Sequence, residues 1–261
     1  MLEFDHVTKQ YHSGMFGKVV TRAVDDVSFT VGENERVGLL GESGCGKTTI
    51  ARLACKLLKP TSGTIRFEGH DISKLSKSET KALHKDVQLI FQNPQFAFSP
   101  RMKLYDTIAE PLRVHGLVSS SDEERRTIDE YMDLMGLTRD IYTRYPHEIS
   151  GGQAQRIAIM RIIMLEPKLF IADEPTTMLD VSVQAQILSM LKHLLDDRQT
   201  ALIFVTHDLE VLHAMCDRIL VIDHGQVVEE GPVDDIFTNP RNEYTKSLVP
   251  DSDILLKAHI D

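Results

Sequence analysis

Cysteine is scarce in this sequence, and the three cysteines do not form a pattern. Cys45, Cys55 and Cys216 lack the paired spacing with which cysteines hold zinc or an iron-sulfur cluster. We therefore predict free thiols in a reducing compartment, with the cytosol as the default location.

Long hydrophobic runs are also missing. The most apolar stretch, Ile157–Leu165, is interrupted by Arg161 and is too short to cross a bilayer. The first residues carry acids and a histidine where a secretory leader has a basic and then an apolar segment, so we expect no export signal. Any work at a membrane would then be that of a peripheral subunit.

Basic residues do not predominate. The chain has 29 Lys and Arg against 39 Asp and Glu, giving a net charge of -10 and a pI near 5.6. This is the wrong sign for a protein whose main partner is a phosphate backbone, so we predict no nucleic-acid partner. With 42% hydrophobic and 26% charged residues in 261, the composition is that of a packed globular protein and excludes disorder and fibrous repeats.

Short apolar runs alternate with longer helical patterns. Residues 36–40, 168–173 and 201–206 read as buried strands, each followed by a turn and a helical stretch, which predicts a mostly parallel sheet covered by helices. Period-2 alternation in residues 2–7 and 25–31 predicts a small antiparallel sheet beside it. Between Gln92 and Ile149 helical patterns replace strands, as expected of a helical insert, and no internal repeat is present.

A phosphate-binding loop follows the first of these buried strands. Residues 41–48, GESGCGKT, match G-x-x-x-x-G-K-[ST] between a strand and a helix. Glycines let backbone N–H groups surround a phosphate, Lys47 reaches the β and γ phosphates, and the Thr48 hydroxyl binds Mg²⁺. The residues predicted to bind the nucleotide here are Gly41, Ser43, Gly44, Cys45, Gly46, Lys47, Thr48 and Thr49.

A second buried strand ends in two acids. Asp173 is placed to reach the Mg²⁺ through water, while Glu174 lies beyond it and can polarise an attacking water. Many strands end in acids that cap a helix, so Asp173 and Glu174 indicate a catalytic function only together with the upstream loop. Together, the loop and the pair predict a nucleoside triphosphatase.

The segment before a later helical pattern indicates which kind of triphosphatase this is. Ser150, Gly151, Gly152 and Gln153 in ISGGQ resemble the signature of the ATP-binding cassette (ABC) family, and they lie between the phosphate loop and the acidic pair as that family requires. Small residues at a helix N-terminus allow close approach to a γ phosphate.

Other positions take roles only through this resemblance. It implies that Gln92 senses Mg²⁺ and the attacking water, that Asp180 belongs to the D-loop, and that His207 contacts the γ phosphate. It also implies that Tyr11 stacks on adenine. Plainer interpretations stay open: Gln92 as a strand-end cap, His207 as a surface residue and Tyr11 as ordinary sheet surface.

The resemblance extends over nearly the whole chain and favours one branch. GESGCGKTT, FQNP with FSPRM, IAEPL, YPHEISGGQ, LDVSVQAQIL and NEYTKSLV are similar to the oligopeptide, dipeptide and nickel importer ATPases. Ile149, Ala154 and Met178 depart from the usual residues without removing a phosphate-contacting group. The cysteine cluster of some members is absent, so we predict no iron-sulfur cluster.

The resemblance implies an α/β fold: a P-loop NTPase (RecA-like) core with a mostly parallel sheet, an N-terminal antiparallel β subdomain and an inserted α-helical subdomain. The expected boundaries are residues 1–91 and 151–236 for the ATP-binding core, 92–150 for the helical subdomain and 237–261 for a C-terminal tail. The implied cofactors are ATP and Mg²⁺, with Thr48, Gln92 and Asp173 at the metal and Glu174, His207, Gln92 and Lys47 in catalysis.

The implied partners are a second ABC ATPase, identical or a sister chain, two membrane permeases and, indirectly, an external solute-binding protein. ATP would lie between two head-to-tail subunits on the cytoplasmic face of the membrane, with residues 93–102 contacting a permease. One alternative is an ATPase docked on an enzyme assembly, as in the carbon-phosphorus lyase system. A cassette acting on DNA or ribosomes is disfavoured by the acidic balance. The solute stays open.

Overall fold

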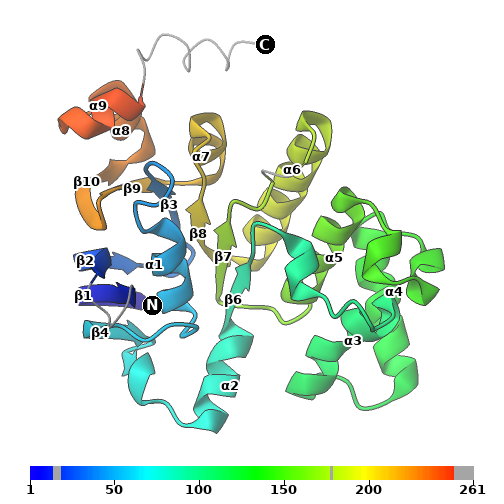
Figure 1. The fold of residues 1–261 in the computed structure, drawn as a ribbon. Coiled ribbons are helices and arrows are strands. Elements are labelled where there is room, and N and C mark those ends of the chain that lie inside the picture. Colours follow the sequence, from blue (N-terminus) through cyan, green and yellow to red (C-terminus); the bar gives the residue numbers. More distant parts are fainter. Residues whose placement is uncertain (14–18, 177–178, 250–261) are drawn as a thin grey trace. The chain divides into compact units, whose positions relative to one another are not determined.

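The computed structural model describes residues 1–13, 19–176 and 179–249 (Figure 1). The chain forms two compact units, which are described separately. Unit 1 is Met1–Thr80 with Gln199–Asp261, and unit 2 is Lys81–Arg198. The boundaries expected above for core, insert and tail stay a prediction.

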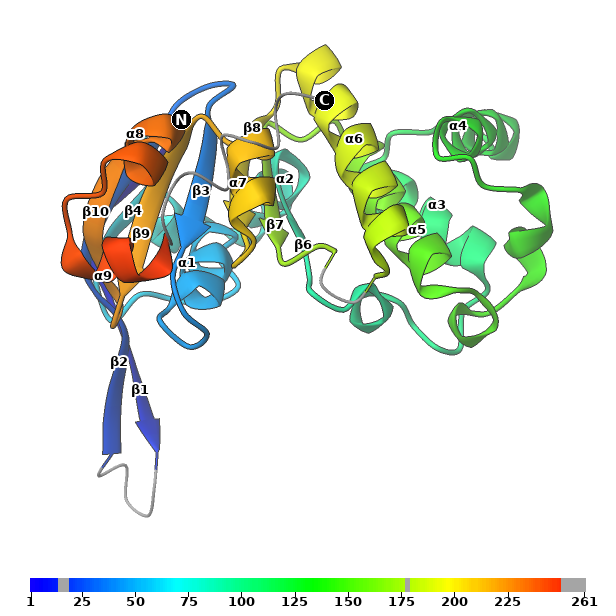
Figure 2. The same cartoon turned by 90° about the horizontal axis from the view of Figure 1, so that it is seen from above.

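An antiparallel sheet begins unit 1. Its strands are β1 (Leu2–Ser13), β2 (Val19–Val31), β4 (Ser62–Phe67) and β5 (His70–Asp71), in the order β2-β1-β4-β5. Alternate residues of β2 are buried from Val27 to Val31, as the period-2 pattern predicts, and Phe29 stacks on Phe4 with ring centroids 4.6 Å apart. The far ends of β1 and β2 extend beyond the rest of this sheet (Figure 2).

The other strands of unit 1 lie in the order β10-β9-β3-β8. They are β3 (Arg36–Leu40), β8 (Ala201–Val205), β9 (Arg218–Asp223) and β10 (Gln226–Pro232). β3 pairs in parallel with both β8 and β9, while β9 and β10 form an antiparallel pair. Every residue of β8 is buried, which explains its uninterrupted apolar sequence, so the predicted mostly parallel sheet is confirmed here.

Short helices complete unit 1. They are α1 (Lys47–Ala54), the 3-10 helix η2 (Ile72–Lys74), α7 (Leu209–Met215), α8 (Val233–Thr238) and α9 (Glu243–Leu248), and α2 (Lys77–Asp86) crosses the boundary between the units. β3 leads through the phosphate loop into α1 (Figure 1). Helices α8 and α9 fall in and beside the predicted tail, where the sequence has little periodicity.

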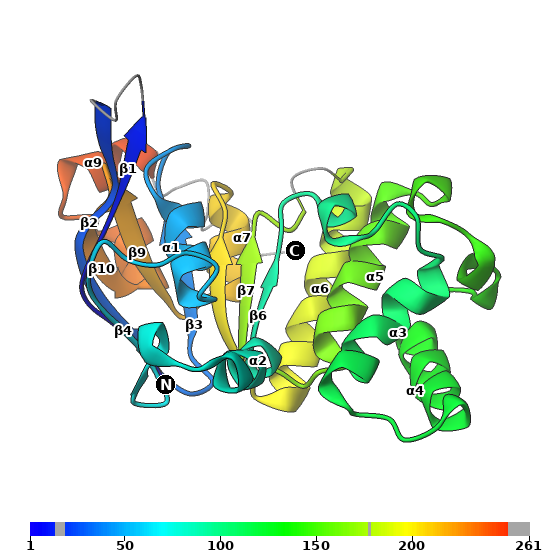
Figure 3. The ribbon, with the colours of Figure 1, turned by 60° about the horizontal axis from the view of Figure 1, so that its bottom comes forward.

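Unit 2 combines a parallel strand pair with most of the long helices. The pair is β6 (Val87–Ile90) with β7 (Leu169–Asp173). The helices are α3 (Leu104–His115), α4 (Ser121–Leu134), α5 (Gly151–Ile163), α6 (Val181–Arg198) and the 3-10 helices η3 (Pro94–Ala97), η4 (Arg139–Thr143) and η5 (Pro146–Glu148). α5 and α6 run side by side (Figures 2 and 3), joined by a hydrogen bond from Arg156 to Gln186. None of the helices in the described residues is both long and apolar enough to span a bilayer.

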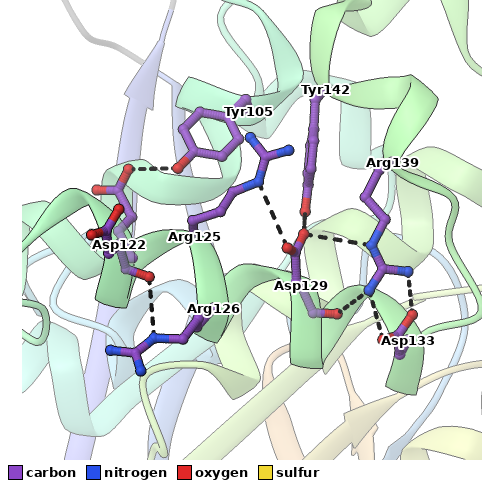
Figure 4. Close-up of polar contacts among 9 residues, drawn as sticks. Tyr105, Asp122, Arg125, Arg126, Asp129, Asp133, Arg139 and Tyr142 are labelled. Carbon is purple, nitrogen blue, oxygen red and sulfur yellow. Dashed lines mark hydrogen bonds and ion pairs between the residues drawn. The ribbon is translucent and has the colours of Figure 1, made fainter.

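Charged and aromatic side chains join α3, α4 and η4 (Figure 4). The Arg125 guanidinium lies 4.5 Å from the ring centroid of Tyr142 and 5.4 Å from that of Tyr105. The Tyr142 hydroxyl donates to Asp129, and Arg139 pairs with both Asp129 and Asp133 on the same helix. These contacts fix η4 against α4.

Glu124 lies at the buried edge of this cluster. Its carboxylate accepts hydrogen bonds from Arg113 Nε at 2.6 Å and from the Tyr105 hydroxyl at 3.0 Å. The bond from Arg113 lowers the pKa of Glu124, an effect that burial opposes and the bond from Tyr105 reinforces. Folding is therefore favoured by the ionised carboxylate, which ties α3 to α4.

We expect Glu124→Gln to lower the free energy of unfolding by about 1–3 kcal/mol at pH 7, because it breaks charge-assisted hydrogen bonds. A depressed folded-state pKa gives stability that is complete above the unfolded carboxyl pKa of about 4.3 and is lost as the pH falls through the folded value. Urea unfolding from pH 7 to pH 3 should therefore show the gap between parent and variant closing below about pH 4. Glu130→Gln, exposed on the same helix, is the control. A gap that stays constant with pH would contradict this assignment.

Candidate nucleotide-binding site

In unit 1 the phosphate loop curves between β3 and α1. Gly41, Gly44 and Gly46 all have positive φ, at 152°, 86° and 119°. An added Cβ at Gly41 would lie 2.2 Å from the Ile222 carbonyl oxygen, and one at Gly46 would lie 2.2 Å from that of Ala23. Glycine is therefore required at these two positions both by the backbone conformation and by close packing.

Lys47 is folded back into this loop and is only 6% exposed. Its Nζ donates to the carbonyl oxygens of Gly41 at 2.5 Å and Glu42 at 2.8 Å, and it lies 3.6 Å from Cys45 Sγ. A buried ammonium group needs such partners, because its removal from water is otherwise costly. The loop thus holds one positive charge at its centre.

The first turn of α1 supplies further donors. Its N-cap residue, Gly46, has no side chain, so the first backbone amides of this helix receive no side-chain capping bond. Such amides favour an anion, which the helix dipole also attracts. Ser43 and Gly44 are exposed beside them, and Thr48 and Thr49 are half-buried. Phosphate binding at this helix start stays a prediction.

Two further predicted residues of unit 1 lie on other elements. Tyr11, on β1, is 39% exposed, with Lys9 Nζ 5.4 Å from its ring centroid. His207 is exposed directly after β8, and the following Asp208 caps α7. Stacking of Tyr11 on adenine and contact of His207 with a γ phosphate stay predictions.

Unit 2 brings Gln92 and Glu174 together. Gln92 follows β6, Glu174 follows β7, and the two strands are parallel neighbours, so their carboxyl ends share one edge. The Gln92 amide donates to the Glu174 carboxylate at 2.7 Å. Asp173, the last residue of β7, is 6% exposed. The acidic pair therefore stands at a strand end with the expected glutamine as its neighbour.

The signature segment opens α5. Ser150 is the N-cap: its hydroxyl accepts from the Gln153 amide at 3.2 Å, while the Gln153 side chain accepts from the Ser150 amide at 3.0 Å. A Cβ on Gly152 would lie 3.0 Å from Val183 on α6, so a larger residue would crowd this contact. The segment presents a preorganised helix N-terminus with small residues.

Asp180 performs a similar capping role at α6. Its carboxylate accepts from the Val183 amide at 3.0 Å and from the Ser182 hydroxyl at 2.8 Å. The backbone bond from Val183, followed by the bond from Ser182, lowers the pKa of Asp180. Met178, in the predicted D-loop, lies outside the described residues.

A cavity of about 170 Å³ in unit 2 links several of these segments. It is lined by Gln92, Asn93, Pro94, Gly151, Gln155, Pro175 and Leu179. Gln155, which sequence reasoning missed, is 1% exposed, and no described residue forms a hydrogen bond with its Nε2. The same reasoning missed Tyr244 on α9, whose hydroxyl accepts from the Glu42 amide of the phosphate loop at 3.0 Å. The only sequence signal was the stretch NEYTKSLV around it.

Comparison with known proteins identifies the family. The family model described as ABC transporter matches residues 24–177. The chain belongs to the ABC transporter family. The oligopeptide transport ATP-binding protein OppF of Streptococcus mutans is 43% identical over 98% of this chain and 84% of that protein. The di/tripeptide transport ATP-binding protein DppF of Pseudomonas aeruginosa is 41% identical over 93% of this chain and 76% of that protein.

Solved structures agree with this family assignment. The dimeric ATP-binding cassette MJ0796, in a post-hydrolysis state bound to ADP and Pi, has a TM-score of 0.80 at 28% identity and covers 89% of this chain and 99% of its own. CbiO1 from Clostridium perfringens, part of an ABC transporter complex, has a TM-score of 0.76 at 26% identity over 91% of this chain and 90% of its own. The fold of this ABC protein is therefore that of the cassette ATPases, and its activity is ATP hydrolysis, as the sequence predicts.

Substitution of two glycines of this ABC ATPase separates the energetic cost of backbone strain from the cost of steric overlap with neighbouring residues. Gly44→Ala should cost about 1–2 kcal/mol of stability, because only its left-handed conformation opposes a Cβ. Gly46→Ala should cost about 1–3 kcal/mol more, because the Cβ also meets the Ala23 carbonyl. Chemical unfolding of the nucleotide-free variants measures both. Equal losses would show that the loop does not pack on β2 as described.

Proposed function

We propose that this chain is the ATP-hydrolysing subunit of an importer for peptides or a related small solute, working from the cytoplasmic face of the membrane. Its likeness to OppF and DppF over most of their lengths supports the peptide class. The observation that carries the catalytic part is the hydrogen bond between Gln92 and Glu174 beside the buried Asp173.

In the proposed reaction Glu174 polarises the attacking water and Gln92 keeps its carboxylate oriented. Lys47 and the amides at the start of α1 stabilise negative charge on the β and γ phosphates, and His207 holds the γ phosphate from the loop after β8. Tyr11 supports the adenine. Each proposed role is consistent with the position of the residue in its own unit.

Mg²⁺ suits the donors that the sequence places here. Asp173, Gln92 and Thr48 offer hard oxygen ligands, and Mg²⁺ prefers one or two such groups together with phosphate oxygens and water. Within the part of the chain that the structure describes, no three acidic, histidine or cysteine side chains gather at a metal site. The metal would neutralise charge that develops on the phosphates.

A second cassette would complete the site. The signature segment Ser150–Gln153 of one subunit would face the phosphate loop of the other, so that ATP closes a head-to-tail dimer and hydrolysis reopens it. The dimeric structure of the cassette MJ0796 supports this arrangement. The alternation between closed and open dimers is the two-state element that would drive the permeases.

The permease contact is proposed at a cavity of about 390 Å³ in unit 2. Its wall includes Phe91, Pro94 and Ala97, which lie in or next to the segment 93–102 expected to meet a permease, together with apolar residues of α3 and α5. Arg161 in this wall donates to the Ala97 carbonyl and to Glu110, both at 2.9 Å. An apolar hollow with a charged pair at its edge suits a short amphipathic helix.

The test is purification of tagged Glu174→Gln from native membranes in mild detergent with ATP and Mg²⁺. The amide cannot act as a base, so we expect ATP to be bound, turnover to fall about 100-fold or more, and the closed complex to persist. Mass spectrometry should then identify polytopic permeases and a second ATPase. Glu166→Gln, an exposed acid of the same unit, is the control and should hydrolyse ATP at the parental rate.

Two outcomes would contradict the proposal. Recovery only from the soluble fraction, bound to an enzyme assembly, would favour the docked-ATPase alternative. Hydrolysis by Glu174→Gln at the parental rate would show that another group activates the water.

A further inference from the structure

The last helix of the described chain reaches the phosphate loop. Tyr244, on α9, lies 202 positions from Glu42, yet its hydroxyl oxygen accepts the Glu42 backbone N–H at 3.0 Å. Both residues belong to unit 1. Glu42 is the second residue of the loop that surrounds Lys47.

The peptide between Gly41 and Glu42 connects Tyr244 to Lys47. Its N–H donates to Tyr244, and its carbonyl oxygen accepts from Lys47 Nζ at 2.5 Å. Because a peptide is planar, the N–H and the C=O turn together, so a bond that fixes one end also fixes the other. Gly41 precedes this peptide with a φ of 152°, and glycine allows it to rotate more freely than any other residue would.

The tyrosine is itself held firmly. Glu229 on β10 accepts the backbone amides of Arg241 at 2.8 Å and Asn242 at 3.0 Å. The Asn242 side chain then caps α9 by accepting the Tyr244 amide at 2.8 Å. Burial would raise the pKa of Glu229, but the nearby Thr245 side chain, the two amide bonds and the charge of Arg241 outweigh it and lower the pKa, so the anchor is ionised at neutral pH.

The hydroxyl is in the state that this contact needs. Burial, together with the nearby Cys45, Asp223 and Glu42, raises the pKa of Tyr244, although the amide of Glu42 opposes the rise. The phenol therefore stays protonated at neutral pH, and its oxygen accepts the amide as a neutral group.

We propose that Tyr244 is a positioning residue for nucleotide binding: it fixes the Gly41–Glu42 peptide so that the Gly41 carbonyl holds Lys47 in place before ATP arrives. A preplaced ammonium group loses less conformational freedom when phosphate binds, so affinity rises without direct contact between Tyr244 and the nucleotide. This inference rests on the proposed nucleotide site at the loop, and it gives the C-terminal segment a role in that site.

The test is titration of the full chain with a fluorescent ATP analogue in the presence of Mg²⁺. Tyr244→Phe removes only the hydroxyl, and we expect the dissociation constant to rise about three- to tenfold, the size of one hydrogen bond, with an unchanged number of binding sites per chain. The nucleotide-free melting temperature should fall by no more than about 4 °C, since one hydrogen bond is lost while the ring packing is retained. Ser247→Ala, which removes a hydroxyl that bonds only within α9, should bind like the parent.

The readouts separate this role from a structural one. If Tyr244 merely stabilised the fold, Tyr244→Phe would lower the melting temperature and the number of sites and leave the dissociation constant unchanged, which would overturn the inference. Lys47→Ala tests the site itself. Parental affinity in Lys47→Ala would refute the proposed nucleotide site, whereas loss there with parental affinity in Tyr244→Phe would refute only the role of Tyr244.

Discussion

The buried ammonium group of Lys47 is the constraint on which the phosphate loop depends. Lys47 is only 6% exposed, so its ammonium group needs oxygen partners from the protein in place of water. The carbonyls of Gly41 and Glu42 supply two of them, and they can do so only because the chain reverses sharply around the side chain. That reversal in turn requires glycine where a Cβ would meet neighbouring backbone. The burial of the Lys47 charge, the sharp turn of the chain and the glycines therefore depend on one another.

The rest of unit 1 supports this curve from outside. The Ala23 carbonyl of β2 and the Ile222 carbonyl of β9 lie against Gly46 and Gly41, and the Gly225 amide donates to the Cys45 carbonyl at 2.9 Å. The two sheets of the unit thus meet at the loop. Elements outside the loop, including β10 and α9, help to fix it.

Much of this could be predicted where the determinant is local in sequence. The loop motif, the buried strands around it, the period-2 pattern of β2 and the helix that begins at Gly151 all depend on residues within a few positions of one another, and the structure contains them. The Tyr244 contact depends on residues 202 positions apart and on α9, which has six residues and too little periodicity to be recognised. For the same reason the hydrogen bond between Gln92 and Glu174 could not be predicted from the sequence, because nothing in either segment alone specifies the other.

Backbone conformation adds an argument about Glu174 that residue identity cannot provide. Its φ is 48°, in the left-handed region that a residue with a Cβ enters only at a cost of about 1–2 kcal/mol. The residue directly after β9, His224, has a similar φ of 44°, so the turn after each of these two strands places a residue with a Cβ in this region. At residue 174 the strained position carries a carboxylate. The Gln92 amide holds that carboxylate by donating a hydrogen bond to it at 2.7 Å. Strain at a functional group that a neighbour holds in place is the arrangement expected of a preorganised base, because the cost of orienting it is met on folding and not during the reaction. The conformation at residue 174 and the role proposed for its side chain therefore support each other.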